Sequence, residues 1–194
     1  MKQFLNNKKI LFFSPNFLGY DQVIKKGLED QGADVSLYDE RPSDKSVVKA
    51  LIRINPSVYK PFSKKYFIKV FEKEKHNNFD YIFVIKGEAL TSEIIYVMKD
   101  YFINSKLIFY TWDSLRNVRD MDKKIFLYDR VFSFDRGDCN TSNNISYLPL
   151  FFPPCYDVKI KDSSSIKKIN DLIFIASLHS DRYKVLNKIL KEPR

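Results

Sequence analysis

The chain has 194 residues, 44% of them apolar, and a formal net charge of +9. This length allows one complete domain and part of another, and the apolar share is sufficient for a buried core. No apolar run approaches the roughly 20 residues that span a bilayer, and the start shows no signal-peptide pattern, so we expect a cytoplasmic protein. Cys139 and Cys155 form no Cys-x-x-Cys pair, and the only two histidines, His76 and His179, exclude a His-rich metal site.

Short apolar runs alternate with helical patterns along the chain, which predicts an α/β fold with a Rossmann-like, doubly wound parallel sheet. Strands are expected at 9–14, 34–38, 80–86, 106–111, 130–134, 145–150 and 172–176. Helices are expected at 21–31, 44–54, 62–75 and 91–102, and again from Asp181. Gly32 is placed to end the first helix, and Thr91 is placed to cap a later one.

The pattern also predicts two parts of unequal size. Residues 1–156 form a Rossmann-like domain, and residues 157–170, which include three consecutive serines, form a linker. Residues 171–194 are the first strand and helix of a truncated second domain.

Three nucleotide or hydrolase motifs are missing from the sequence. The first strand is not followed by Gly-x-Gly-x-x-Gly, and its turn has only Gly19. The P-loop pattern and the Gly-x-Ser-x-Gly elbow do not occur. These gaps argue against a dinucleotide enzyme, a P-loop enzyme and an α/β-hydrolase.

Carboxylates follow three of the expected strands, where doubly wound sheets bind ligands. Glu88, Asp113 and Asp135 can act as general bases or bind sugar hydroxyls, or they can simply form turns and caps. Asp113 is the strongest candidate because Trp112 precedes it and an aromatic ring offers a sugar a stacking surface. Trp112 can equally be an ordinary core residue.

Near the end of the chain, His179, Ser180 and Arg182 stand at an expected helix start. Free N–H groups and an arginine at such a position can bind a phosphate. The alternative is a capped helix with solvated charges.

Residues 45–75 carry nine Lys and Arg against two Glu, which is most of the excess positive charge. Within 58–75 these basic residues interleave with aromatic residues at helical spacing. The simplest interpretation is a helix that packs on the sheet with its lysines in solvent. The alternative is attraction to an anionic membrane surface. Nucleic-acid binding is not expected, since the rest of the chain adds no basic surface.

Seven short motifs occur in a recognisable order: Lys9–Pro15, Tyr38–Arg41, Ile85–Glu88, Tyr110–Ser114, Val131–Asp135, Tyr147–Leu150 and Asp171–Arg182. Through them the chain resembles bacterial lipopolysaccharide- and capsule-type glycosyltransferases of GT-B fold, close to the spore-maturation glycosyltransferase-like family. The resemblance covers nearly the whole chain, and its specificity lies in the order of the motifs.

The resemblance implies an amino-terminal domain that faces the acceptor and a carboxy-terminal domain that binds a nucleotide-sugar, with no metal or other cofactor. It places the catalytic role on Asp113 and Glu88. The acceptor side would be lined by Asn16, Phe17, Lys86, Gly87, Trp112 and Asp135. The donor phosphates would meet His179, Ser180 and Arg182.

The expected function is therefore sugar transfer from a nucleotide-sugar to a surface-polysaccharide or lipid-linked acceptor. An enzyme of this kind can lie on the inner face of the cell membrane through residues 45–75. The usual donor-binding motifs are missing, so this chain alone is expected to be inactive. Two alternatives stay open: a non-catalytic binding or partner domain that retains the fold, and a flavodoxin-like nucleotide-binding domain.

Overall fold

In the computed structural model, the described residues are 3–42, 56–118, 120–141, 144–153, 173–175 and 181–191. The chain divides into two compact units, residues 1–156 and 157–194. The helix expected at 44–54 lies outside the described residues.

The first unit is built on a six-stranded sheet in which every neighbouring pair is parallel. The strand order is β2-β1-β3-β4-β5-β6. The strands are β1 (Lys9–Ser14), β2 (Asp34–Asp39), β3 (Tyr81–Ile85), β4 (Lys106–Thr111), β5 (Arg130–Ser133) and β6 (Ile145–Tyr147). The central strands β1, β3 and β4 are formed by nearly continuous apolar runs because both faces of a parallel sheet are covered.

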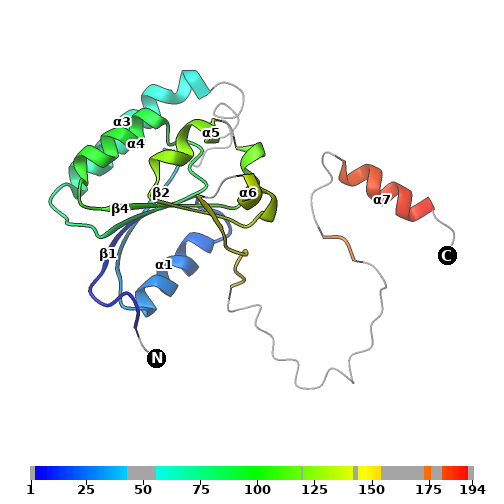
Figure 1. Cartoon of the computed structure of the whole chain (residues 1–194), viewed down its shortest axis with the longest axis horizontal. Helices are drawn as coiled ribbons and strands as arrows, with labels where there is room; N and C mark the ends of the chain where they lie inside the picture. The colour runs from blue at the N-terminus through cyan, green and yellow to red at the C-terminus, as the bar shows by residue number, and fades with distance from the viewer. Residues whose placement is uncertain are drawn as a thin grey trace. The chain divides into compact units, whose positions relative to one another are not determined.

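Helices cover both faces of the sheet, so the fold is the Rossmann-like, doubly wound α/β arrangement that the sequence predicts (Figure 1). Helix α1 (Tyr20–Asp30) lies on one face. The opposite face carries α3 (Pro56–Glu74), α4 (Ser92–Tyr101) and α5 (Met121–Lys124) (Figure 1). The short helix α6 (Arg136–Thr141) joins β5 to β6, and two 3₁₀ turns, Leu115–Asn117 and Ile125–Leu127, flank α5.

The hydrophobic core has one layer on each face of the sheet, because successive side chains of a strand point to opposite faces. Leu11 and Phe13 of β1 face α3, where they meet Phe67 and Phe71, and all four side chains are fully buried. Ile10 and Phe12 face α1. Burial of each large side chain contributes roughly 2–3 kcal/mol, so the larger layer beneath α3 and α4 is the main source of stability.

The predicted helix signals are confirmed at both positions. Gly32 has φ +95°, and a Cβ at that residue would lie 2.9 Å from the Cα atom of Asn6, so only glycine fits where α1 ends. The hydroxyl of Thr91 accepts a hydrogen bond from the N–H of Ile94 at 3.3 Å and caps α4.

Three predicted elements differ from the structure, one of which is the strand expected at 145–150, since β6 ends at Tyr147. The helix expected at 62–75 begins at Pro56 and includes Pro61, because burial of Phe67, Val70 and Phe71 outweighs the one hydrogen bond that an internal proline removes. The strand expected at 172–176 is absent over 173–175. Ile173, Phe174 and Ile175 are exposed, and the described part of the second unit offers them no strand to pair with.

The second unit contributes helix α7 (Arg182–Lys191). None of the helices within the described ranges is long and apolar enough to cross a membrane.

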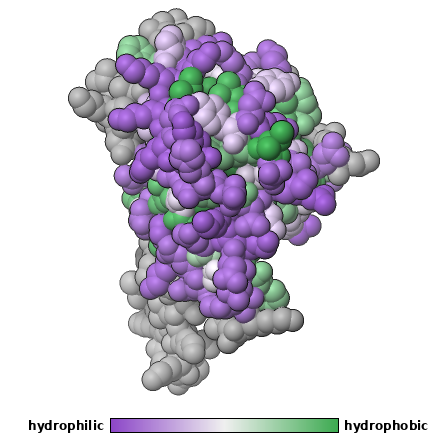
Figure 2. Space-filling view, turned by 90° about the vertical axis from the view of Figure 1, so that its left-hand side faces the viewer, coloured by the Kyte–Doolittle hydropathy of each residue, from purple (hydrophilic) through white to green (hydrophobic). Residues whose placement is uncertain are grey.

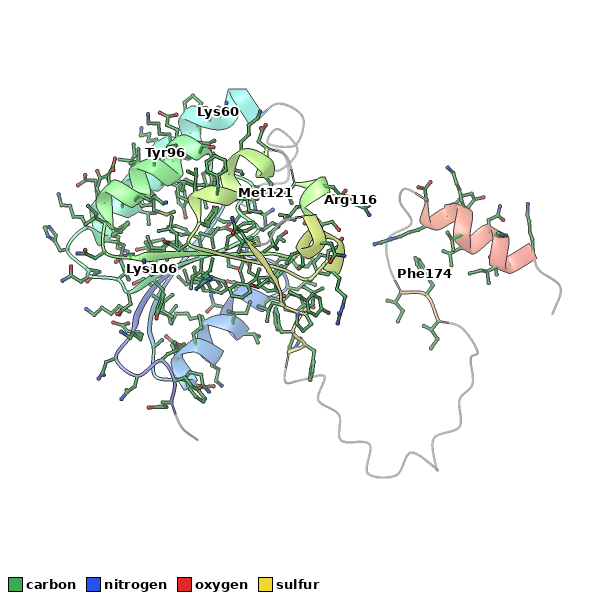
Figure 3. All side chains as sticks on the ribbon, viewed as in Figure 1. Lys60, Tyr96, Lys106, Arg116, Met121 and Phe174 are labelled. Atoms are coloured by element: carbon green, nitrogen blue, oxygen red, sulfur yellow. The ribbon has the colours of Figure 1, made fainter. Side chains whose placement is uncertain are left out.

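The starts and the ends of the parallel strands lie on opposite sides of the first unit. Lys106 stands at the start of β4 and Arg116 follows shortly after its end, and the two residues lie at opposite ends of the strands (Figure 3). The side on which the strands begin is mostly hydrophilic, with small scattered hydrophobic spots (Figure 2). The loops that follow the strands, at the other edge, carry the residues considered next.

Candidate functional site

The sheet has a switch point between β1 and β3. The chain leaves β1 toward β2 on one side, and from β3 onward it moves toward β4 on the other side. In doubly wound sheets a ligand crevice forms where the carboxyl ends of two such strands diverge. Residues that follow β1 and β3 are therefore the first candidates for ligand contact.

The loop after β3 has an unusual backbone. Lys86 has φ +71° and Gly87 has φ +62°. A Cβ on Gly87 would lie 3.1 Å from Cε2 of Phe109, which favours glycine at this position. A lysine in the left-handed region costs conformational energy, and such residues cluster at functional sites.

Lys86 brings together the two carboxylates that the sequence singles out. Its Nζ atom lies 3.3 Å from Oε1 of Glu88 and 3.4 Å from Oδ2 of Asp113. The Asp113 side chain is 46% exposed, so a ligand can reach it. The structure thus forms a cation between two carboxylates at the carboxyl ends of β3 and β4, a triad that can bind hydroxyl groups and accept a proton.

A buried lysine stabilises the loop after β3 through hydrogen bonds to its backbone. Lys124 of α5 is only 4% exposed, and its Nζ atom donates hydrogen bonds to the carbonyl oxygens of Gly87 at 3.1 Å and Leu90 at 3.0 Å. Burial lowers the pKa of Lys124, and the nearby negative charge of Glu40 opposes that change. The strained loop is therefore fixed by side chains that no ligand needs to contact.

Glu40 is the second buried support of the loop. It has no exposed surface, and its Oε2 atom accepts a hydrogen bond from the N–H of Ala89 at 3.4 Å. Its Oε1 atom lies 3.6 Å from Nε of Arg41. Burial, and after it the charge of Glu88, raises the pKa of Glu40 to about 7.

Sequence reasoning missed the roles of Glu40 and Lys124. Glu40 directly follows the second strand, and that position marks it as a residue near the ligand end of the sheet without indicating its burial. Lys124 carries no such signal, because its burial comes from the packing of a four-residue helix.

Asp135 is occupied by local contacts. Its Oδ1 accepts from the N–H of Gly137 at 2.8 Å, and its Oδ2 accepts from the hydroxyl of Ser114. The Ser114 hydrogen bond, followed by the Gly137 bond, lowers the pKa of Asp135. These contacts are those of a residue that begins α6 and ties it to the loop after β4.

Trp112 packs against other aromatic rings. Its ring packs toward α1, 6.2 Å from the ring of Tyr20 and 5.9 Å from the ring of Phe151. Phe17 is 6.0 Å from Tyr20 and 52% exposed. We call Phe17, Tyr20, Trp112 and Phe151 the aromatic cluster; its partly exposed rings lie on the α1 side of the sheet.

Asn16 lines a separate depression of about 330 Å³. This depression lies between the ends of β1 and β2 and the first half of α1, and its walls are Ser14, Asn16, Asp21, Gln22, Lys25, Leu37 and Asp39. The structure thus joins Lys86 with the predicted catalytic residues Glu88 and Asp113 in the triad, and it places Asn16 in a depression on the other side of the switch point.

The predicted donor-phosphate residues are described only in part. Arg182 is the first residue of α7 and is exposed, whereas His179 and Ser180 lie outside the described residues. Over the described residues, no three His, Cys, Asp or Glu side chains come together as a metal site.

No protein-family model matches the chain, and it matches neither a curated protein nor a solved structure.

Proposed function

We propose that this chain is the acceptor-side part of a GT-B-type glycosyltransferase, which transfers a sugar from a nucleotide-sugar to a surface-polysaccharide or lipid-linked acceptor. The observation that carries the proposal is the triad of Lys86, Glu88 and Asp113 at the carboxyl ends of β3 and β4, next to the switch point of the sheet. The order of the sequence motifs supports it independently.

Asp113 takes the role of general base. An acceptor hydroxyl that hydrogen-bonds to the exposed side of Asp113 transfers its proton to this carboxylate as the hydroxyl oxygen attacks the sugar. The new bond forms between that oxygen and the anomeric carbon, and the bond from this carbon to the nucleoside diphosphate breaks with its electron pair on the diphosphate. Lys86 orients Asp113, and Glu88 holds Lys86 from its other side.

The donor half of the reaction belongs to the second unit in this proposal. Arg182 is the residue we assign to the diphosphate, because a guanidinium binds phosphate oxygens in a bidentate manner. It is the first residue of α7, and the N-terminus of a helix is a favourable place for an anion.

The basic surface of α3 fits a lipid-linked acceptor. Lys60, Lys65 and Lys69 are exposed on this helix, whereas Lys64 pairs with Glu93. Exposed lysines attract a protein to anionic lipid headgroups. We therefore place the protein in the cytoplasm, on the inner face of the membrane.

A non-catalytic binding domain is the second candidate. Both carboxylates of the triad are already paired with Lys86, and that arrangement can also serve only to hold the loop. The flavodoxin-like alternative is less favoured, since the turn after β1 begins with Pro15, which has no N–H, and exposes the apolar side chains of Phe17 and Leu18 instead of phosphate ligands.

A transfer assay separates the two candidates. The protein as the cell makes it would be mixed with a panel of nucleotide-sugars and with lipid-linked or polysaccharide acceptors. The nucleoside diphosphate that is released would then be measured. A glycosyltransferase gives acceptor-dependent release with at least one donor. Acceptor binding without release across the whole panel would favour the binding domain.

A further inference from the structure

The depression between β1, β2 and α1 lies apart from the triad, and the proposed reaction does not use it. We propose that this depression binds an amine-bearing polyol, of which an amino sugar is the simplest example, through the carboxylate of Asp21. The inference concerns what the first unit recognises, and it holds whether or not the chain takes part in sugar transfer.

Six of the seven residues that line the depression have polar or charged side chains. Ser14, Asp39 and Leu37 come from the strand ends, and Asn16 comes from the loop after β1. Asp21, Gln22 and Lys25 come from α1. Its volume of about 330 Å³ is at the small end of the range for ligand pockets, which suits a ligand of monosaccharide size.

Asp21 is the unusual residue of this wall. It is only 7% exposed, and its Oδ2 atom accepts a hydrogen bond from the side-chain amide of Gln22 at 3.1 Å. Its Oδ1 atom is buried and has no hydrogen-bond partner among the described residues. A buried carboxylate oxygen without a donor is costly. Because Asp21 lines the depression, a ligand there whose donor reaches this carboxylate would offset that cost.

The charges around the depression favour a cationic donor. Lys25, one turn from Asp21, forms an ion pair with Glu29. Asp39 accepts a hydrogen bond from the N–H of Arg41 at 2.8 Å, and Nε of Arg41 lies 4.0 Å from the same carboxylate. Asp21 has no ion-pair partner over the described residues, so an ammonium group is the partner that the Asp21 carboxylate lacks.

The remaining walls suit hydroxyl groups. Ser14, Asn16 and Asp39 present hydroxyl, amide and carboxylate atoms that can exchange hydrogen bonds with a polyol. Phe17 and Tyr20, which neighbour Asn16 and Asp21 in the chain, are members of the aromatic cluster. Tyr20 also touches Trp112, the only tryptophan of the chain, so ligand binding at Asp21 should change tryptophan fluorescence.

The test compares three sugars that differ in charge. D-Glucosamine, D-glucose and D-glucuronate would be titrated into the full chain at about pH 6.5, where an amine of this kind is protonated, with Trp112 fluorescence and calorimetry as readouts. We expect glucosamine to bind about fivefold or more tighter than glucose, because a charge-assisted hydrogen bond is stronger than a neutral one, and glucuronate to bind weakest.

Two variants on the same helix give the matched comparison. Asp21→Asn should remove the preference for glucosamine over glucose, and Asp30→Asn, an exposed position at the end of α1, should keep it. Far-UV circular dichroism checks that both variants fold. The inference is overturned if glucose or glucuronate binds as tightly as glucosamine to the unmodified chain, if none of the three binds, or if folded Asp21→Asn keeps the preference. A transfer assay without product would count against the proposed function but would not bear on this sugar-binding test.

Discussion

Glu40 should make the stability of the first unit depend on pH in a direction opposite to that of an ordinary surface carboxylate. Its side chain is fully buried beside the triad, and burial raises its pKa from the ordinary 4.5 to about 7. Below about pH 4.5 the carboxyl group is neutral in both the folded and the unfolded chain. Between the two pKa values the folded chain binds more protons than the unfolded chain, so stability falls as the pH rises.

The size of the effect follows from the two pKa values. A difference of this size corresponds to about 3 kcal/mol, and it is fully expressed above pH 7, where the buried carboxylate must be charged. Glu40→Gln removes the titration and keeps the shape of the side chain. The variant should therefore gain stability relative to the unmodified chain as the pH rises from about 5 to about 8.

Urea unfolding followed by circular dichroism at several pH values measures this difference. The matched control is Glu29→Gln, which changes an exposed glutamate on α1. The difference in stability between this variant and the unmodified chain should change much less over the same pH range. If Glu40→Gln and the unmodified chain keep a constant difference from pH 5 to pH 8, the account of Glu40 as a buried, strained support is wrong.

Three further changes test the support of the loop and the basic helix. Lys124→Met leaves the carbonyls of Gly87 and Leu90 without this donor and should lower the free energy of unfolding in urea by about 2–4 kcal/mol. The control is Lys123→Met at an exposed position, and an equal loss in both variants would contradict the buried role of Lys124. Gly87→Ala should cost about 2 kcal/mol, because φ is +62° and Phe109 is in contact, and an unchanged midpoint would argue against this backbone. The full chain should sediment with anionic vesicles at low salt and not with neutral ones, and binding should fall when three exposed lysines are changed to Glu; equal binding to both vesicles would leave α3 as a solvated surface. These lysines are Lys60, Lys65 and Lys69.

The centre of the sheet could be predicted because β1, β3 and β4 are buried on both faces and therefore appear in the sequence as nearly continuous apolar runs. The run at 9–14 matches β1 at both ends. The run at 145–150 is longer than β6, which ends at Tyr147, because the neighbouring strand β5 ends at Ser133 and residues 148–152 are exposed. The short helices α5 and α6 were not predicted, since four to six residues are too few to show a helical period.

The sequence predicted only those site residues that directly follow a strand. Lys86, Glu88 and Asp113 follow strands, and the rule that ligands meet the carboxyl ends of parallel strands marks such residues. The expected pairing of Trp112 with Asp113 did not follow from that rule. Consecutive residues at a strand end point to opposite faces, so Trp112 joins Tyr110 on the α1 side while Asp113 turns toward Lys86.

The most direct test of the proposed function is the rate of sugar transfer by Asp113→Asn. With an active donor and acceptor pair in hand, this substitution should lower the rate by roughly 100-fold or more, because the acceptor hydroxyl loses its base. Asp100→Asn, an exposed position on α4, should leave the rate unchanged. A folded Asp113→Asn variant that transfers sugar at the unmodified rate would contradict the central claim that the triad is the catalytic site.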